Sequence, residues 1–184
     1  MVVLVVVAAL TLAACSTNDP KYRPGTLPPL SPTPTAVASS SASPSPTGTR
    51  GMADKDQVRV VYLGFVRHYQ QAEDQPAGRR RAFLSQWMTD PGLASMTKAI
   101  DQQVAQHRHS SGRFRPNIMS IKVSGSTAIV DDCLDQRHFH MKDTRTGKVV
   151  GGGSDFLWAV VTLKKAAEGW RVSNPSYRNK TCVP

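Results

Sequence analysis

The sequence predicts an α+β domain, in which N-terminal helices pack on one face of a curved antiparallel sheet. Apolar residues between positions 54 and 109 recur every three or four residues, which is typical of amphipathic helices. From Ile118 onward the apolar period changes to two, and glycine-containing turns separate the runs, which indicates short strands. Because the helices come first and the strands follow, we expect a helical layer against an antiparallel sheet.

Three helices are predicted in the first part of this domain. The first spans Asp54 to Glu73, with one apolar stripe that contains Tyr62 and Tyr69. The second spans Arg79 to Met88. The third begins at Thr89-Asp90-Pro91, because a capping Asp followed by Pro at the first helical position is a strong start signal. It runs to about His109, and Ser110-Ser111-Gly112 ends it.

Five strands are predicted in the second part of the domain. They are Ile118 to Val123, Thr127 to Leu134, Arg137 to Lys142, Phe156 to Lys164 and Trp170 to Asn174. Alternation in the first strand places Met119, Ile121 and Val123 on one face. Gly151-Gly152-Gly153 is expected to form a flexible loop. We find no internal repeat, so residues 53–184 are expected to form one domain with a modest core.

The chain is predicted to begin with a lipoprotein signal peptide at residues 1–14. This run is almost entirely apolar, but it is too short to span a bilayer as a helix, which needs about 20 residues. Leu12-Ala13-Ala14-Cys15 resembles a bacterial lipobox, in which the cysteine thiol receives diacylglycerol. We therefore expect acylation (palmitate or similar chains) at Cys15 and a place on the extracytoplasmic face of the cell membrane. The alternative is an ordinary signal peptide with an incidental cysteine.

No Lys or Arg precedes Cys15, although export signals usually begin with a basic segment. We therefore expect the true start codon to lie upstream of Met1. Residues 15–52 are predicted to be a disordered tether, because Pro, Ser and Thr make up 21 of the 35 residues from 16 to 50. Such a composition offers no apolar face that could be buried.

The formal net charge is +10. The cations of the domain gather in short groups, namely Arg79-Arg80-Arg81, His107-Arg108-His109 with Arg113 and Arg115, Lys142 with Arg145 and Lys148, and Lys164-Lys165. Outside the cytoplasm the available polyanions are lipid headgroups and wall polymers, so no nucleic-acid partner is expected. The simplest interpretation is a solvated basic face. The alternative is electrostatic contact with anionic lipid or wall polymer, worth roughly 1 kcal/mol per cation near a membrane.

Cys133 and Cys182 are the two cysteines that follow Cys15. An even pair in an exported protein predicts a disulfide, and this one would close a loop of about 50 residues. On the chain-entropy model such a bridge stabilises by about 4 kcal/mol. The alternative is a pair of buried thiols.

Two short motifs carry a family resemblance. The run from Gly125 to Asp135, and Gly169-Trp170-Arg171-Val172 followed by Cys182, resemble actinobacterial lipoproteins with a nuclear transport factor 2-like (SnoaL-like, cystatin-like) domain. The resemblance covers residues 55–183 in element order. It implies a cone-shaped domain whose bent sheet wraps a long helix and leaves a pocket at its open end. Members of the superfamily include isomerases, hydratases and ligand binders, so the resemblance implies a fold rather than an activity.

This sequence departs from the family pattern in its strong basicity and in the turn Ser124-Gly125-Ser126, where Asp-Gly-Asp is common. Asp131, Asp132 and Asp135 form its cluster of carboxylates. A pocket carboxylate with a raised pKa could serve as a general base, and Asp135 or a tyrosine is the candidate polar group. The simpler interpretation is that these carboxylates are solvated or paired with arginine.

His138 and His140 are predicted to share a strand face and could meet a metal, but no third ligand is assured, so neither a metal nor another cofactor is expected. Tyr62, Tyr69 and Trp158 could line a pocket, although aromatic residues at such spacings more often form core. No nucleophile elbow, phosphate loop or zinc pattern is present in the sequence. The expected function is therefore a non-enzymatic binding or envelope-associated domain, and the alternative is a small enzyme or hydrophobic-ligand carrier.

Overall fold

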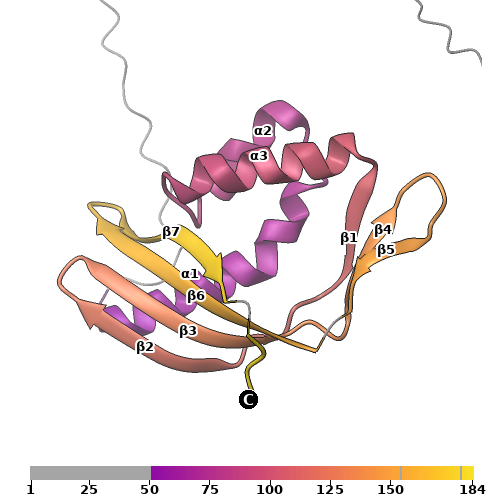
Figure 1. Ribbon diagram of the computed structural model, residues 1–184. Helices are drawn as coiled ribbons and strands as arrows, with labels where there is room; N and C mark the ends of the chain where they lie inside the picture. The colour runs from indigo at the N-terminus through magenta and orange to yellow at the C-terminus, as the bar shows by residue number, and fades with distance from the viewer. Residues whose placement is uncertain (1–50, 154, 179) are drawn as a thin grey trace, which may run out of the picture. The chain divides into compact units, whose positions relative to one another are not determined.

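The computed structural model describes residues 51–153, 155–178 and 180–184. The predicted signal peptide, Cys15 and almost all of the predicted tether lie outside these residues. The helices of the described part are α1 (Asp54–His68), the 3-10 helix η1 (Tyr69–Ala72), α2 (Ala77–Leu84) and α3 (Gly92–Ala105). The strands are β1 (Arg108–Gly112), β2 (Ile118–Ser124), β3 (Thr127–Asp135), β4 (Phe139–Asp143), β5 (Val149–Gly152), β6 (Phe156–Ala166) and β7 (Gly169–Tyr177) (Figure 1). None of the described helices is long and apolar enough to cross a bilayer.

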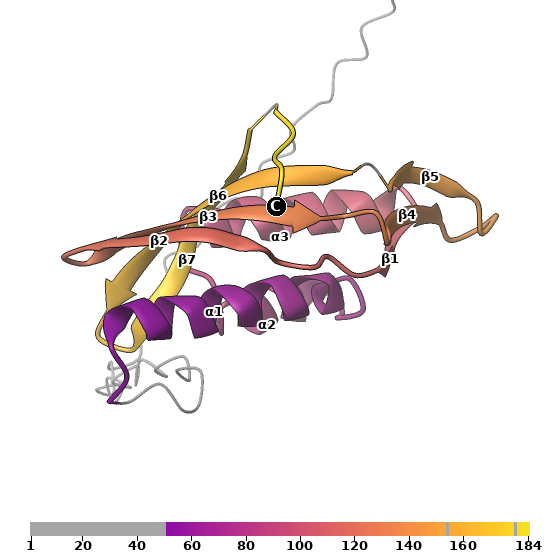
Figure 2. The same ribbon diagram turned by 90° about the horizontal axis from the view of Figure 1, so that it is seen from below.

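The strands form two antiparallel sheets. One has the order β2-β3-β6-β7 and the other the order β1-β4-β5. Figure 2 shows α1 lying along one face of the four-stranded sheet. The predicted α+β fold class, with helices packed on an antiparallel sheet, is confirmed.

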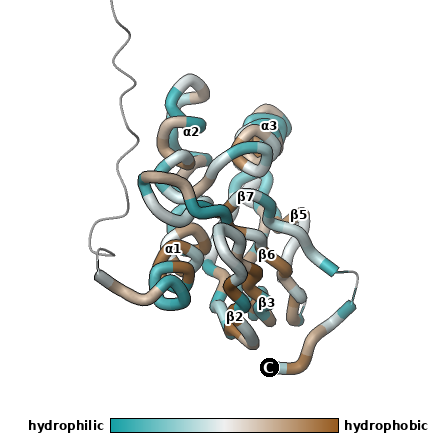
Figure 3. The backbone as a smooth tube through the Cα atoms, turned by 90° about the vertical axis from the view of Figure 1, so that its left-hand side faces the viewer, coloured by the Kyte–Doolittle hydropathy of each residue, from teal (hydrophilic) through white to brown (hydrophobic). Residues whose placement is uncertain are grey.

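The core lies between α1 and the four-stranded sheet. Alternate residues of β3 and β6 point toward α1, and Val130 and Val161, at most 2% exposed, belong to one apolar cluster with Val58 and Val61 of the helix. Trp170 of β7 closes one end of the core at 1% exposure. Figure 3 shows apolar segments in α1 and in the neighbouring strands β3 and β6. Among the described residues, the buried members of this apolar cluster lie between Val58 and Val172.

The second helix is shorter than predicted, because the residues expected to form its C-terminal end pair with β7 instead. It ends at Leu84 rather than Met88. The backbone beyond it bonds to β7 at Val172, whose N–H donates to the Trp87 carbonyl at 2.9 Å and whose carbonyl accepts from Thr89 N–H at 2.8 Å. These two hydrogen bonds satisfy backbone groups that a longer helix would have paired internally.

Two predicted connections are in fact strands. The third helix ends at Ala105, and residues 108–112, predicted to finish and cap it, form β1 opposite β4. The prediction of a flexible loop at Gly151-Gly152-Gly153 is also wrong, since Gly151 and Gly152 pair with β4 as part of β5. Gly152 has φ +82°, and a Cβ on it would lie 2.6 Å from the Phe139 carbonyl oxygen, so glycine permits the close approach of the two strands.

The predicted apolar face of the first strand is only partly buried. Ile121 is 8% exposed, but Met119 and Val123 are 43% and 37% exposed. A register shift between Ile118 and Ser120 interrupts the alternation, and Ile118 packs against the core instead. A β-bulge of this kind adds one residue to a strand and changes which side chains face inward.

The predicted disulfide between Cys133 and Cys182 is confirmed, with Cα atoms 5.7 Å apart. Cys133 lies between Asp132 and Leu134 on β3, and its side chain therefore points away from α1. The C-terminal segment reaches the face of the sheet that is opposite α1 (Figure 2). Cys133 is consequently fully buried although it lies on the outer face.

Candidate functional site

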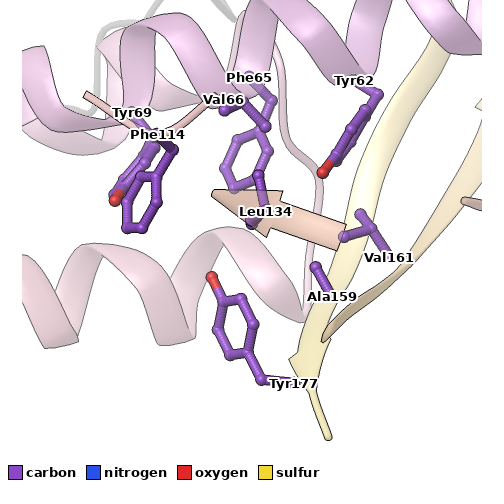
Figure 4. Close-up of a pocket in the computed structure, with 9 residues that line it drawn as sticks. All are labelled: Tyr62, Phe65, Val66, Tyr69, Phe114, Leu134, Ala159, Val161 and Tyr177. Carbon is purple, nitrogen blue, oxygen red and sulfur yellow. The ribbon is translucent and has the colours of Figure 1, made fainter. Parts of the chain in front are cut away.

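A pocket opens between α1 and the four-stranded sheet. Its volume is about 270 Å³ when the space at its mouth is included, and the fully enclosed part has room for about one water molecule. The lining residues are Tyr62, Phe65, Val66, Tyr69, Phe114, Leu134, Ala159, Val161 and Tyr177 (Figure 4). None of these nine side chains carries a charge. The two predicted pocket tyrosines, Tyr62 and Tyr69, are both among them.

Aromatic rings form one wall of the pocket. The ring centroids of Phe65 and Tyr69 are 5.6 Å apart, and those of Tyr69 and Phe114 are 5.9 Å apart. Phe114 in turn stacks on Phe139 of β4 with centroids 4.1 Å apart. The first pair is tilted and the other two are stacked. Aromatic rings at these distances attract one another, so this wall is held in place by its own packing.

Tyr62 joins the pocket to a buried carboxylate. Its hydroxyl donates to one oxygen of Asp132, and the other oxygen accepts the Asn117 N–H at 2.6 Å. Asp132 is fully buried, and this burial raises its pKa, while the hydrogen bonds from Tyr62 and from backbone N–H groups act in the opposite direction. Burial and the neighbouring Asp132 also raise the pKa of Tyr62 far above its ordinary value. Tyr62 therefore remains a neutral donor to Asp132.

Tyr69 and Tyr177 bring two further hydroxyl groups to the pocket. Neither hydroxyl has a hydrogen-bond partner among the described residues. Tyr177 stands opposite Ala159 at the end of β7, and this register puts both on the inner face of the sheet. As a residue Tyr177 is 52% exposed, but its hydroxyl points into the pocket (Figure 4). Burial of the hydroxyl end raises the pKa of both tyrosines, so both are neutral.

Comparison with known proteins shows which solved structures this chain resembles. No family model and no curated protein matches the sequence. The intermembrane-space region of the chloroplast protein ARC6 superposes with a TM-score of 0.53 at 13% identity, over 68% of this chain and 96% of that one. An NTF2-like protein with a cystatin-like fold from Novosphingobium aromaticivorans gives 0.42 at 13% identity, over 67% and 80%. A protein from Kribbella flavida gives 0.46 at 12% identity, over 67% and 88%.

One of these neighbours, the Novosphingobium protein, is described as NTF2-like with a cystatin-like fold. At these identities the likeness concerns the fold alone. The α+β arrangement expected from the motifs around Cys133 and Trp170 is confirmed by the elements themselves, while the nuclear transport factor 2-like family, the actinobacterial source and the lipid anchor stay predictions.

Asp135 lies outside the pocket lining. Its two carboxylate oxygens accept from the Arg137 guanidinium at 3.0 and 2.8 Å. These hydrogen bonds hold the pKa of Asp135 well below its usual range. Asp135 is therefore a charged group committed to Arg137.

The remaining candidates from the sequence are also placed outside the lining. Trp158 lies on the outer face opposite Cys133, with the Arg178 guanidinium 4.4 Å from its ring centroid. His138 is exposed just before β4, and His140 is half-buried within β4. No group of three or more metal-ligating side chains lies together among the described residues.

Sequence reasoning missed Phe114, Tyr177 and the pairing of Tyr62 with Asp132. Phe114 stands between two arginines in a connection without apolar periodicity. Tyr177 lies three residues beyond the predicted end of its strand. Alternation along β3 separates Asp132 from Asp131 and Asp135, but the sequence did not show that Asp132 would meet Tyr62 of α1.

Proposed function

We propose that this chain is an exported lipoprotein whose folded domain is a non-enzymatic binding module. Cys15 would hold it at the extracytoplasmic face of the cell membrane, and the pocket would take a small ligand. The observation that carries the binding part is the uncharged, mostly aromatic lining, in which the Tyr69 and Tyr177 hydroxyls have no hydrogen-bond partner within the described part of the chain. Small-molecule sites typically combine apolar walls with a few placed polar groups.

The carboxylates near the pocket already have hydrogen-bond or ion-pair partners, and this supports a non-enzymatic role. A general base must reach the proton that it abstracts, within hydrogen-bonding distance. Asp132 lies behind Tyr62 and is already an acceptor for Tyr62 and Asn117. Asp135 is paired with Arg137. Neither carboxylate is therefore free to face a ligand.

The binding part is tested by filling the pocket. Ala159→Leu adds three carbon atoms on the inner face of β6, and Val160→Leu adds one carbon atom on the outer face. We expect the chain from residue 16 to 184 to bind ethylbenzene in calorimetric titration, Val160→Leu to retain binding and Ala159→Leu to lose it. Equal binding by both variants would place the ligand elsewhere. Turnover of a small molecule at an ordinary enzymatic rate would contradict the non-enzymatic role.

The anchor is tested by mass spectrometry of chain recovered from cells. We expect the mature protein to begin with a diacylglyceryl Cys15 in the membrane fraction, and Cys15→Ser to release it. The disulfide supports this location, because such bridges persist in oxidising compartments. An unmodified thiol at Cys15 in chain from the cytosol would contradict the proposal.

A second contact with anionic lipid headgroups is favoured by the basic surface. Lys142 and Lys148 are exposed beside the β4–β5 turn and have no ion pair among the described residues, whereas Asp143 is paired with Arg145. We expect the chain from residue 16 to 184 to bind vesicles containing phosphatidylglycerol, and the double variant Lys142→Gln, Lys148→Gln to bind them more weakly. Binding that ignores salt would contradict the electrostatic contact, because exposed charges are screened within about 10 Å at 0.1 M.

A further inference from the structure

We propose that the β4–β5 hairpin docks on an anionic lipid bilayer, with Val149 and Val150 entering the headgroup layer and Lys142 and Lys148 meeting the phosphates. This inference rests on the proposed contact with anionic lipid and adds an apolar part to it. The valines determine the kind of surface that fits the hairpin, and the lysines determine its charge.

Val149 and Val150 form an apolar patch on the hairpin. They are 56% and 49% exposed, and all four residues of β5 are exposed. Among the large apolar residues that are exposed in the described part of the chain, these two are the only ones adjacent in sequence. The hairpin extends beyond the helices (Figure 1). The patch therefore meets solvent at an end of the domain, where a large partner can reach it.

Two lysines lie beside this patch. Lys142 of β4 is opposite Val149 in the register of the two strands, so both side chains lie on one face of the hairpin. Lys148 directly precedes Val149 in the chain. Asp143, the single acidic residue of the hairpin, is already paired with Arg145. Three cations against one carboxylate give the hairpin a formal net charge of +2.

Valines beside lysines favour a bilayer over other partners. A dissolved anionic polymer would pair with the lysines but would leave the valines in water. A second copy of this chain would cover the valines but would bring like charges together. An anionic bilayer offers phosphates above an apolar layer. The long lysine stems can hold the ammonium groups at the phosphates while the shorter valine side chains lie deeper.

The backbone of β5 limits the depth of insertion. β5 is the last strand in the order β1-β4-β5, so one of its edges has no strand partner among the described residues. Unpaired N–H and carbonyl groups are costly in the hydrocarbon core, which holds no water to satisfy them. We therefore expect the valines to stop at the boundary between headgroups and acyl chains.

The experiment compares two matched pairs of valines on vesicles of phosphatidylcholine and phosphatidylglycerol. The chain from residue 16 to 184 is used, so that binding does not depend on an acyl anchor. The hairpin variant carries Val149→Thr and Val150→Thr, which keep β-branched side chains and hence the preference for a strand. The control variant carries Val60→Thr and Val123→Thr, at two residues outside the hairpin that are each 37% exposed. Co-sedimentation with the vesicles measures each partition coefficient.

We expect the hairpin variant to partition about tenfold more weakly than the wild type, and the control variant to partition like the wild type. Val149 and Val150 together expose about as much surface as one free valine, and moving one such side chain out of water strengthens binding about tenfold. The salt dependence should persist in the hairpin variant, because its lysines are intact. Equal binding of the hairpin variant and the wild type overturns the inference alone. If the wild type does not bind these vesicles, the proposed lipid contact fails with it.

A fluorescent label at position 150 tests the insertion directly. In the chain from residue 16 to 184 the two cysteines form the disulfide, so Val150→Cys supplies one free thiol for an environment-sensitive fluorophore. Ser95→Cys, exposed on α3, is the control. We expect the vesicles to shift the emission of the label at position 150 to the blue, and nitroxide-labelled phospholipid to quench it, with neither effect at position 95. A label at position 150 that stays in water while the chain binds overturns the inference.

Two further measurements separate the bilayer from the other partners. Inorganic polyphosphate, a dissolved polyanion without an apolar layer, should bind the hairpin variant as well as it binds the wild type. In sedimentation velocity the wild type and the hairpin variant should have the same molecular mass. Weaker binding of polyphosphate by the variant, or a wild-type dimer that the variant dissociates, would assign the valines to a polymer or to a second copy and overturn the inference.

Discussion

The two sheets of the domain are held together in different ways. In β3, at the centre of the four-stranded sheet, six of nine residues are buried, whereas all four residues of β5 in the three-stranded sheet are exposed. The four-stranded sheet covers the apolar side of α1. The hairpin of β4 and β5 projects beyond the helices (Figure 1).

Polar contacts at β1 attach the three-stranded sheet to the helices. The carboxylate of Glu73, a buried residue that follows η1, accepts from the Ser110 N–H at 2.7 Å, from the Ser110 hydroxyl and from the Gln103 side-chain amide at 2.6 Å. His109 bonds to Asp74 at 2.9 Å. The contrast teaches that one chain uses apolar burial where it builds a pocket and hydrogen bonds where it presents an exposed basic surface. We expect the two regions to differ in local stability accordingly.

Removal of the disulfide should have the largest effect on the four-stranded sheet. Cys182→Ala opens a covalent loop with a sequence separation of 49, which on the chain-entropy model costs about 4 kcal/mol of the free energy of unfolding. Urea unfolding of the oxidised wild type and of the variant measures this difference. Reduction of the wild-type disulfide should reproduce this loss of unfolding free energy. A loss below about 1 kcal/mol would mean that the bridge constrains the unfolded chain little.

Removal of the Glu73 carboxylate should loosen the three-stranded sheet first. Glu73→Ala leaves the buried Ser110 donors unpaired, at about 1–3 kcal/mol. Amide hydrogen exchange should accelerate in β1 and β4 more than in β3. Glu168→Ala, in the turn before β7, is the control and should leave exchange in β1 unchanged. Equal acceleration of β3 and β1 would show that the two sheets open as one unit.

His109 should make the attachment of β1 depend on pH. Its hydrogen bond to the Asp74 carboxylate is the main cause of its raised pKa. The stabilisation is therefore complete below the unfolded pKa of about 6.5 and is lost as pH rises through the higher folded value. We expect β1 amides to exchange faster at pH 8.5 than at pH 6, after correction for intrinsic rates. His109→Gln should remove this dependence and exposed His138→Gln should keep it.

Periodicity predicted the elements that bury an apolar face. The stripe of α1 and the alternation of β3 and β6 each mark a surface that meets the core, and their positions follow from the sequence. Periodicity failed at β1 and β5, because β5 is exposed throughout and the buried residue of β1 is the polar Ser110. Backbone pairing holds both strands, and Glu73 also holds β1. Such partners lie far away in the chain, and local pattern does not contain them.

The candidate site was predictable to a similar extent. Tyr62 and Tyr69 follow from the helical stripe, because the same face that packs the core also forms the roof of the pocket. Phe114 reaches the pocket through the path of the connection before β2, and Tyr177 reaches it through the register of β7. Their side chains have no periodic partner in the sequence, so only the tertiary arrangement reveals them.

The smallest effect should come from the exposed strand itself. Val149 and Val150 are 56% and 49% exposed, so replacing both with Thr removes little buried apolar surface and should change the free energy of unfolding by less than about 0.5 kcal/mol. The same substitution at Val161, which is 2% exposed in β6, buries a hydroxyl group and should cost about 1–3 kcal/mol. Urea unfolding of the two variants measures the free energy of unfolding after the same Val→Thr change in each sheet. A cost at β5 equal to that at Val161 would mean that β5 is covered in solution, and the division between a packed and an open sheet would then be wrong.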